Sequence, residues 1–99
     1  MAQKLFDSPA MRETIRRLIR GQMAYKGFEY KDLARHLAEL GVEQSESNLR
    51  SKVNNGSLGA QLFAYILLAL GQETLDLRQV ADILKDVRAD EEMQAAGQD

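Results

Sequence analysis

Residues 30–56 read YKDLARHLAELGVEQSESNLRSKVNNG, and this stretch decides the fold of the chain. Its first part carries an apolar stripe at helical spacing, which Gly41 then interrupts. Leu49 and Val53 follow four residues apart, and this predicts a second helix with one narrow apolar edge. Ser45 is a suitable N-cap for that helix, and the closing Asn-Gly pair is a strong stop signal. The stripe of the first helix consists of Leu33, Ala34, Leu37 and Leu40.

The second of these helices offers polar side chains on the side opposite its apolar edge. With Leu49 and Val53 facing the core, Ser and Asn residues point outward, and Arg50 and Lys52 flank them. Arg can bind guanine and Asn can bind adenine in the major groove of DNA. A solvated surface is the alternative, but Ser and Asn are poor helix formers. We therefore predict a helix-turn-helix in which Ser47, Asn48, Arg50, Ser51 and Asn55 read bases, and Lys31, Arg35 and Lys52 hold phosphates.

The composition is that of one ordinary globular domain, with 99 residues of which 44% are hydrophobic and 28% charged. No apolar run approaches the roughly 20 residues needed to cross a bilayer, so we expect no membrane partner. We find no secretory signal. The absence of cysteine excludes disulfides and thiolate zinc sites and is compatible with a reducing compartment. We expect a cytoplasmic protein.

The net charge of −2 hides an uneven distribution. Residues 1–56 contain ten Lys or Arg and seven Asp or Glu, whereas residues 57–99 contain three and eight. The predicted DNA-binding helices therefore lie in the basic half. An acidic total argues against a non-specific coat on nucleic acid, but not against a reader of particular sequences.

Helix signals also flank the central stretch. Ser8 and Pro9 predict the start of a first helix, which Gly27 can end. Ser57 can cap a fourth helix, Leu58 to Leu70, whose apolar circumference predicts a central place in the core. We expect an all-α, compact bundle of about five short helices with a helix-turn-helix core. Its expected parts are an N-terminal arm (1–8), one helical domain (9–89) and an acidic flexible tail (90–99).

The fifth predicted helix, capped by Asp76, runs from about Leu77 to Ala89 and carries an apolar stripe. The stripe can complete the core of the monomer, or it can join two copies of the chain. We favour a homodimer, because helix-turn-helix proteins commonly bring two recognition helices to successive half-sites. The predicted dimer interface consists of Val80, Ile83, Leu84 and Val87.

No pattern in the sequence calls for catalysis. The chain contains no glycine-rich phosphate loop, no HExxH motif and no nucleophile elbow. Its single histidine, His36, has no ligands at metal-binding spacing. We therefore expect no catalytic residue, no metal site, no cofactor and no small-molecule substrate.

The segments GFEYKDLA, LAELGV and NLRSKVNNG are similar to a small family of bacterial domains of unknown function. The resemblance covers roughly residues 11–77 and implies a helix-turn-helix-like fold of the lambda-repressor type. The first helix of the pair is longer than in the usual lambda-type pattern, and so is the turn after it. A family without an assigned function implies nothing about the role of this chain.

Two functions remain open at this point. The first is a sequence-specific double-stranded DNA-binding protein, a small bacterial transcriptional regulator acting as a dimer. The second is a helical protein–protein interaction module that does not bind DNA. The acidic pI of about 5.4, the long turn and the acidic second half motivate this alternative.

Overall fold

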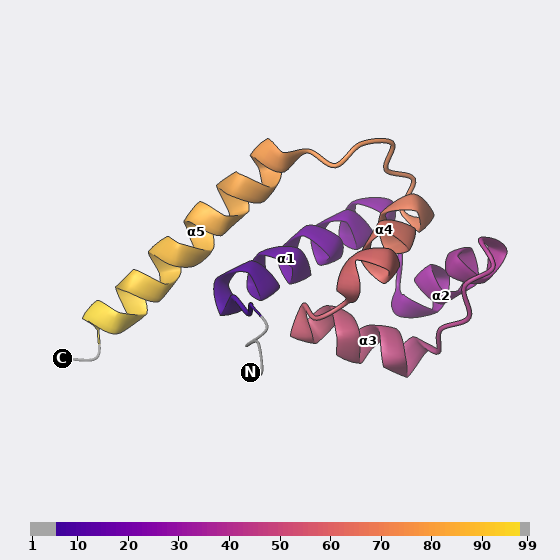
Figure 1. The fold of residues 1–99 in the computed structure, drawn as a ribbon, viewed down its shortest axis with the longest axis horizontal. Coiled ribbons are helices and arrows are strands. Elements are labelled where there is room, and N and C mark those ends of the chain that lie inside the picture. Colours follow the sequence, from indigo (N-terminus) through magenta and orange to yellow (C-terminus); the bar gives the residue numbers. More distant parts are fainter. Residues whose placement is uncertain (1–5, 98–99) are drawn as a thin grey trace, which may run out of the picture.

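The computed structural model describes residues 6–97, which fold into five helices (Figure 1). No strand occurs within this range, so the predicted all-α class is confirmed. Residues 1–5 of the expected N-terminal arm and the last two residues of the expected tail lie outside the described part. The helices are α1 (Pro9–Lys26), α2 (Tyr30–Glu39), α3 (Glu46–Asn55), α4 (Gly59–Ala69) and α5 (Leu77–Ala96).

Most helix ends follow the local signals in the sequence. The hydroxyls of Ser8 and Ser45 each accept a hydrogen bond from a backbone N–H three residues further on, both at 3.1 Å. The carboxylate of Asp76 accepts from two N–H groups at the start of α5. Gly27 and Gly56 follow α1 and α3 with φ of 71° and 64°, in the left-handed region that glycine adopts without steric cost.

The core lies where α1, α2, α3 and α4 meet. The two apolar residues of α3, Leu49 and Val53, are fully buried in it. No helix in residues 6–97 is long and apolar enough to cross a membrane. The buried core side chains are Ile19, Met23, Leu33, Leu37, Leu49, Val53, Ile66 and Leu70.

The last helix is longer than predicted. We expected α5 to end at Ala89 and a flexible tail to follow, but the helix continues to Ala96. The added segment consists largely of good helix formers, and Asp90 within it forms an ion pair with Arg17 of α1 at 3.1 Å. As Figure 1 shows, α5 runs back beside α1 toward the N-terminal end of α1.

The predictions for α4 were wrong in two respects. The helix begins at Gly59, and its N-cap is Leu58, which makes no side-chain capping bond, so Ser57 does not cap it. The helix is also not central, because α5 packs on α1 and leaves the outer side of α4 uncovered. Tyr65 and Leu68 on that side are 41% and 58% exposed.

Two further residues of the predicted apolar stripes face solvent. Leu40 is 44% exposed and Leu77 is 68% exposed. Each stands at the end of its helix, Leu40 as the C-cap of α2 and Leu77 as the first residue of α5. The helical period placed them on the apolar face, but the structure leaves both of these terminal positions exposed.

Candidate nucleic-acid interface

The core holds α3 by one edge and leaves the opposite side free. Leu49 and Val53 have no exposed surface, so the helix cannot turn about its axis without losing this packing. Opposite them lies a polar face, and the carboxylate of Glu46 borders it beside Arg50. The five residues predicted to read bases are all exposed: Ser47, Asn48, Arg50, Ser51 and Asn55.

The connection between α2 and α3 spans residues 40–45 and is fixed to both helices. Gly41 adopts φ of 84°, and the N–H of Val42 donates to the Leu37 carbonyl at 2.9 Å. Val42 also packs against the core. On the α3 side, the amide of Asn48 donates to the side-chain oxygen of Gln44. The side-chain amide of Asn48, which was predicted to read bases, therefore already donates a hydrogen bond within the chain.

The C-terminal end of α3 lies directly against α1. Gly56 is buried, and a Cβ atom at this position would clash with the backbone of Arg12. The absence of a side chain therefore allows the close approach that orients α3 on α1.

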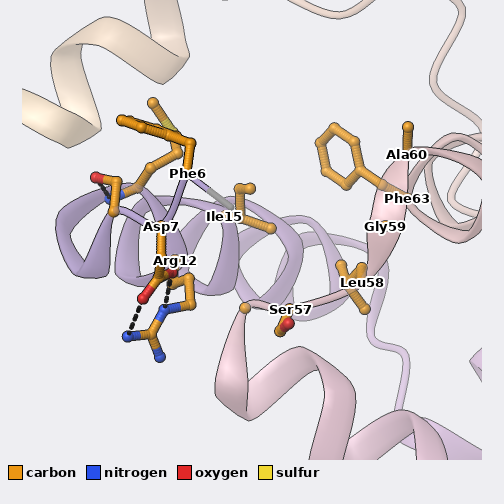
Figure 2. A pocket seen from close by; sticks show the side chains of 12 residues that line it. Phe6, Asp7, Arg12, Ile15, Ser57, Leu58, Gly59, Ala60 and Phe63 are labelled. Atoms are coloured by element: carbon orange, nitrogen blue, oxygen red, sulfur yellow. Dashed lines mark hydrogen bonds and ion pairs between the residues drawn. The ribbon is translucent and has the colours of Figure 1, made fainter. Parts of the chain in front are cut away.

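An apolar hollow of about 330 Å³ adjoins this contact, between the first turns of α1 and the start of α4. Figure 2 shows Ile15, Leu58 and Phe63 around it, with the ion pair of Arg12 and Asp7 at its edge. Its walls come from segments more than 40 residues apart, so no local pattern in the sequence predicts it.

The guanidinium of Arg50 is held by two neighbours. It pairs with the carboxylate of Glu46 at 3.2 Å, and it lies over the ring of Tyr30 at 5.2 Å from the centroid. The three residues border a hollow of about 470 Å³ between α1, α2 and α3, together with Arg20. The Tyr30 hydroxyl is buried without a hydrogen-bond partner among the described residues.

The cations predicted to hold phosphates differ in their surroundings. Lys31 pairs with Glu29 at 3.2 Å, and Arg35 pairs with Asp32 at 3.6 Å. A hydrogen bond from Lys31 to Glu29 raises the pKa of the lysine, so it remains protonated at neutral pH while a carboxylate offsets its charge. Lys52 is half-buried and forms no ion pair with any of residues 6–97.

The predicted dimer residues lie on the side of α5 that meets α1. Val87 is only 3% exposed within a single chain, and Val80, Ile83 and Leu84 are half-buried. Ile83 also lines a hollow together with residues of α1. Val87 therefore belongs to the core of the monomer, the alternative that the sequence left open, and is unavailable to a second copy while α5 stays on α1.

Sequence reasoning missed the carboxylates beside these cations. Glu46 lies four residues before Arg50, a spacing that permits a helical ion pair and can be recognised in the sequence. The packing of Tyr30 beneath Arg50 joins two helices and has no such local signal. Within residues 6–97 no three His, Cys, Asp or Glu residues gather as metal ligands would.

Comparison with known protein families gives a match over most of the chain. The profile of a family described as a domain of unknown function (DUF6471) matches residues 11–75. The chain belongs to the DUF6471 family. The matched region contains α2, α3, α4 and most of α1, whereas α5 lies beyond it. No curated protein and no solved structure matches the chain.

Proposed function

We propose that this DUF6471 chain is a small bacterial transcriptional regulator that binds double-stranded DNA in a sequence-specific way through a helix-turn-helix formed by α2 and α3. The observation that carries the proposal is the outer face of α3, where Ser, Asn and Arg side chains are exposed along a helix anchored by Leu49 and Val53. These side chains can hydrogen-bond to base edges in the major groove, which is wide enough for a helix.

The surroundings of α3 support the same use. Its N-terminal end follows a connection of six residues that packs on the core, and its C-terminal end rests on α1 through Gly56. A helix fixed at both ends presents its side chains in a constant register, which base recognition requires. Lys31, Arg35 and Lys52 lie on α2 and α3 and would meet the phosphates beside the groove.

The ion pairs of Lys31 and Arg35 lead to a quantitative expectation. Exposed pairs of this kind are weak, so phosphates can displace the carboxylates. If three cations in each DNA-binding unit each neutralise one phosphate, the logarithm of the binding constant falls with the logarithm of the salt concentration with a slope of about −3 for one unit and about −5 for the proposed dimer. This slope is modest, so binding to random sequence should be weak at physiological salt.

The experiment is a salt series of binding to a random duplex, followed by selection of bound sequences from a randomised library. We expect the modest slope and an enriched motif with two-fold symmetry. Replacing Lys31 by Gln should lower the steepness of the slope by about one for each DNA-binding unit. The absence of binding at low salt would refute the proposal, because even a poor reader then holds phosphates.

The proposal includes a homodimer, and the uncovered side of α4 supports it. Ala60, Ala64, Tyr65 and Leu68 are exposed there. Residues 53–72, which include all of α4, contain no Asp, Glu, Lys, Arg or His. A two-fold axis brings a surface against its own copy, so charged groups close to the axis would meet groups of like sign. A neutral apolar surface avoids that repulsion, so a second copy of this chain is the partner that we propose for α4.

Two observations favour the helical protein-interaction module as a second candidate. Two of the three predicted phosphate ligands are already paired with carboxylates. The exposed apolar side of α4 is equally suited to a neutral surface of a different protein. This candidate predicts no salt-dependent DNA binding, and a monomeric chain that binds its partner through Leu68.

A further inference from the structure

We propose that Glu46 and Arg50 act together as one reading element for a single G·C base pair. This inference rests on the proposed function, and it assigns a specificity role to Glu46, which the sequence analysis did not include. It also specifies that the DNA half-site bound by one protomer contains a G·C base pair at one position.

The geometry of the pair carries the inference. The guanidinium of Arg50 and the carboxylate of Glu46 lie 3.2 Å apart, so a donor and an acceptor stand side by side on the flank of α3 that lies beside Tyr30 of α2. On the major-groove edge of a G·C pair, guanine O6 accepts and cytosine N4 donates. These two atoms are hydrogen-bonded to each other and therefore also lie about 3 Å apart. The protein pair thus matches the edge of the base pair in spacing and in polarity.

The other base pairs fit this element less well. In C·G and A·T, the base beside Arg50 presents an amino donor (N4 of cytosine or N6 of adenine), where the arginine needs an acceptor. The acceptor, O6 of guanine or O4 of thymine, then lies beside Glu46, so donor and acceptor are in the wrong order. T·A has the correct order, but thymine carries a methyl group and lacks the N7 acceptor that guanine offers to a second N–H of the arginine. Only G·C satisfies the carboxylate of Glu46 and both donors of Arg50.

The position of Glu46 is suited to this contact. It is the first residue of α3, and the N-terminal residues of a recognition helix are those that contact base edges. Its side chain is 49% exposed and that of Arg50 is 51% exposed, so neither is buried away from a groove. The ring of Tyr30 beneath Arg50 restricts the guanidinium to one side and keeps it near Glu46 before DNA arrives.

The ion pair does not prevent binding. An exposed pair four residues apart on a helix changes an equilibrium by about twofold, whereas a bidentate contact from arginine to guanine discriminates by roughly 5- to 150-fold. The guanidinium has five N–H donors, so it can donate to the guanine while it stays beside the carboxylate. The carboxylate of Glu46 would then also accept from the N4 donor of the cytosine.

The test compares two duplexes that differ only by inversion of the selected G·C pair to C·G. We would measure the ratio of their dissociation constants for the unaltered protein, for Glu46→Gln and for the control Glu43→Gln. Glu43 is exposed in the connection between α2 and α3, so the control removes an equal charge from a residue outside the helix. Far-UV circular dichroism would verify that both variants fold.

We expect the ratio to fall at least fivefold, as an order-of-magnitude figure, in Glu46→Gln and to stay unchanged in Glu43→Gln. A purely structural effect of Glu46 on the helix terminus would alter binding to both duplexes equally and leave the ratio unchanged. An unchanged ratio in Glu46→Gln, or a selected motif without a G·C pair, would overturn the inference while DNA binding stands. Failure of the unaltered protein to bind any duplex would overturn the proposed function as well.

Discussion

Replacement of Gly56 by alanine is the sharpest test of how α3 is fixed to the rest of the protein. The residue has φ of 64°, where an L-residue costs about 1–2 kcal/mol. Its Cβ would also lie 2.6 Å from the carbonyl carbon and 2.7 Å from the Cα atom of Arg12, and even closer to the carbonyl oxygen. Because these are backbone atoms, no side chain can move away to make room.

The steric clash with Arg12 adds to the cost of the left-handed backbone conformation. Forcing an extra carbon into a packed site costs about 1–3 kcal/mol, so we expect Gly56→Ala to lower the free energy of unfolding by about 2–5 kcal/mol. Gly27→Ala is the matched control. Gly27 ends α1 with φ of 71°, but nothing lies within 4 Å of the position its Cβ would take. The control should therefore lose only the conformational cost of about 1–2 kcal/mol.

Thermal unfolding followed by circular dichroism at 222 nm separates the two effects. A change of 1 kcal/mol shifts Tm by about 4–8 °C in a domain of this size, so the extra loss of about 1–3 kcal/mol should make Gly56→Ala melt about 4–24 °C below Gly27→Ala. Equal losses of Tm in the two variants would refute the close approach of α3 to α1. A clearly larger loss in Gly56→Ala than in Gly27→Ala would support it.

Three further predictions concern packing, assembly and recognition. Val87→Ala should lower the free energy of unfolding, measured by urea titration, by about 1–2 kcal/mol because Val87 is buried. Leu77→Ala, at an exposed site of the same helix, should change it by less than about 0.5 kcal/mol. Similar losses in the two variants would contradict the packing of α5 on α1. Leu68→Arg should convert the proposed dimer to a monomer in sedimentation equilibrium while far-UV circular dichroism shows an unchanged helical fold, and a persistent dimer would exclude α4 as the interface. Arg50→Ala should weaken binding to the selected duplex by about 1–3 kcal/mol and relax its sequence preference, and unchanged affinity would remove Arg50 from the DNA contact.

Local signals explain why much of the fold was predictable. A cap such as Ser45 or Asp76 acts on backbone groups within one turn of helix, so its effect needs no knowledge of distant residues. The helical period likewise identified Leu49 and Val53 as buried, and with them the outward direction of the polar residues of α3. The exposure of the candidate base-reading face followed from the sequence for that reason.

The contacts of the Arg50 guanidinium could be predicted only in part from the sequence. Glu46 and Arg50 stand four residues apart, so their ion pair follows from helical geometry alone. The placement of Tyr30 under Arg50 depends on how α2 packs against α3, and no spacing in the sequence specifies it. The same holds for the contact of Gly56 with Arg12, which brings together residues 44 positions apart.

By itself, the sequence determined an all-α chain, the ends of most of its helices and the polarity of α3, because these properties arise from interactions along one helix. Only the tertiary structure decided which of two apolar helices would be covered. Both α4 and α5 have an apolar face that can pack against another helix. Hydrophobic periodicity identifies these faces, but it does not show which helix each face packs against. The packing of α5 on α1 buries Val87, places Asp90 of the acidic segment beside Arg17, and leaves Leu68 of α4 in solvent.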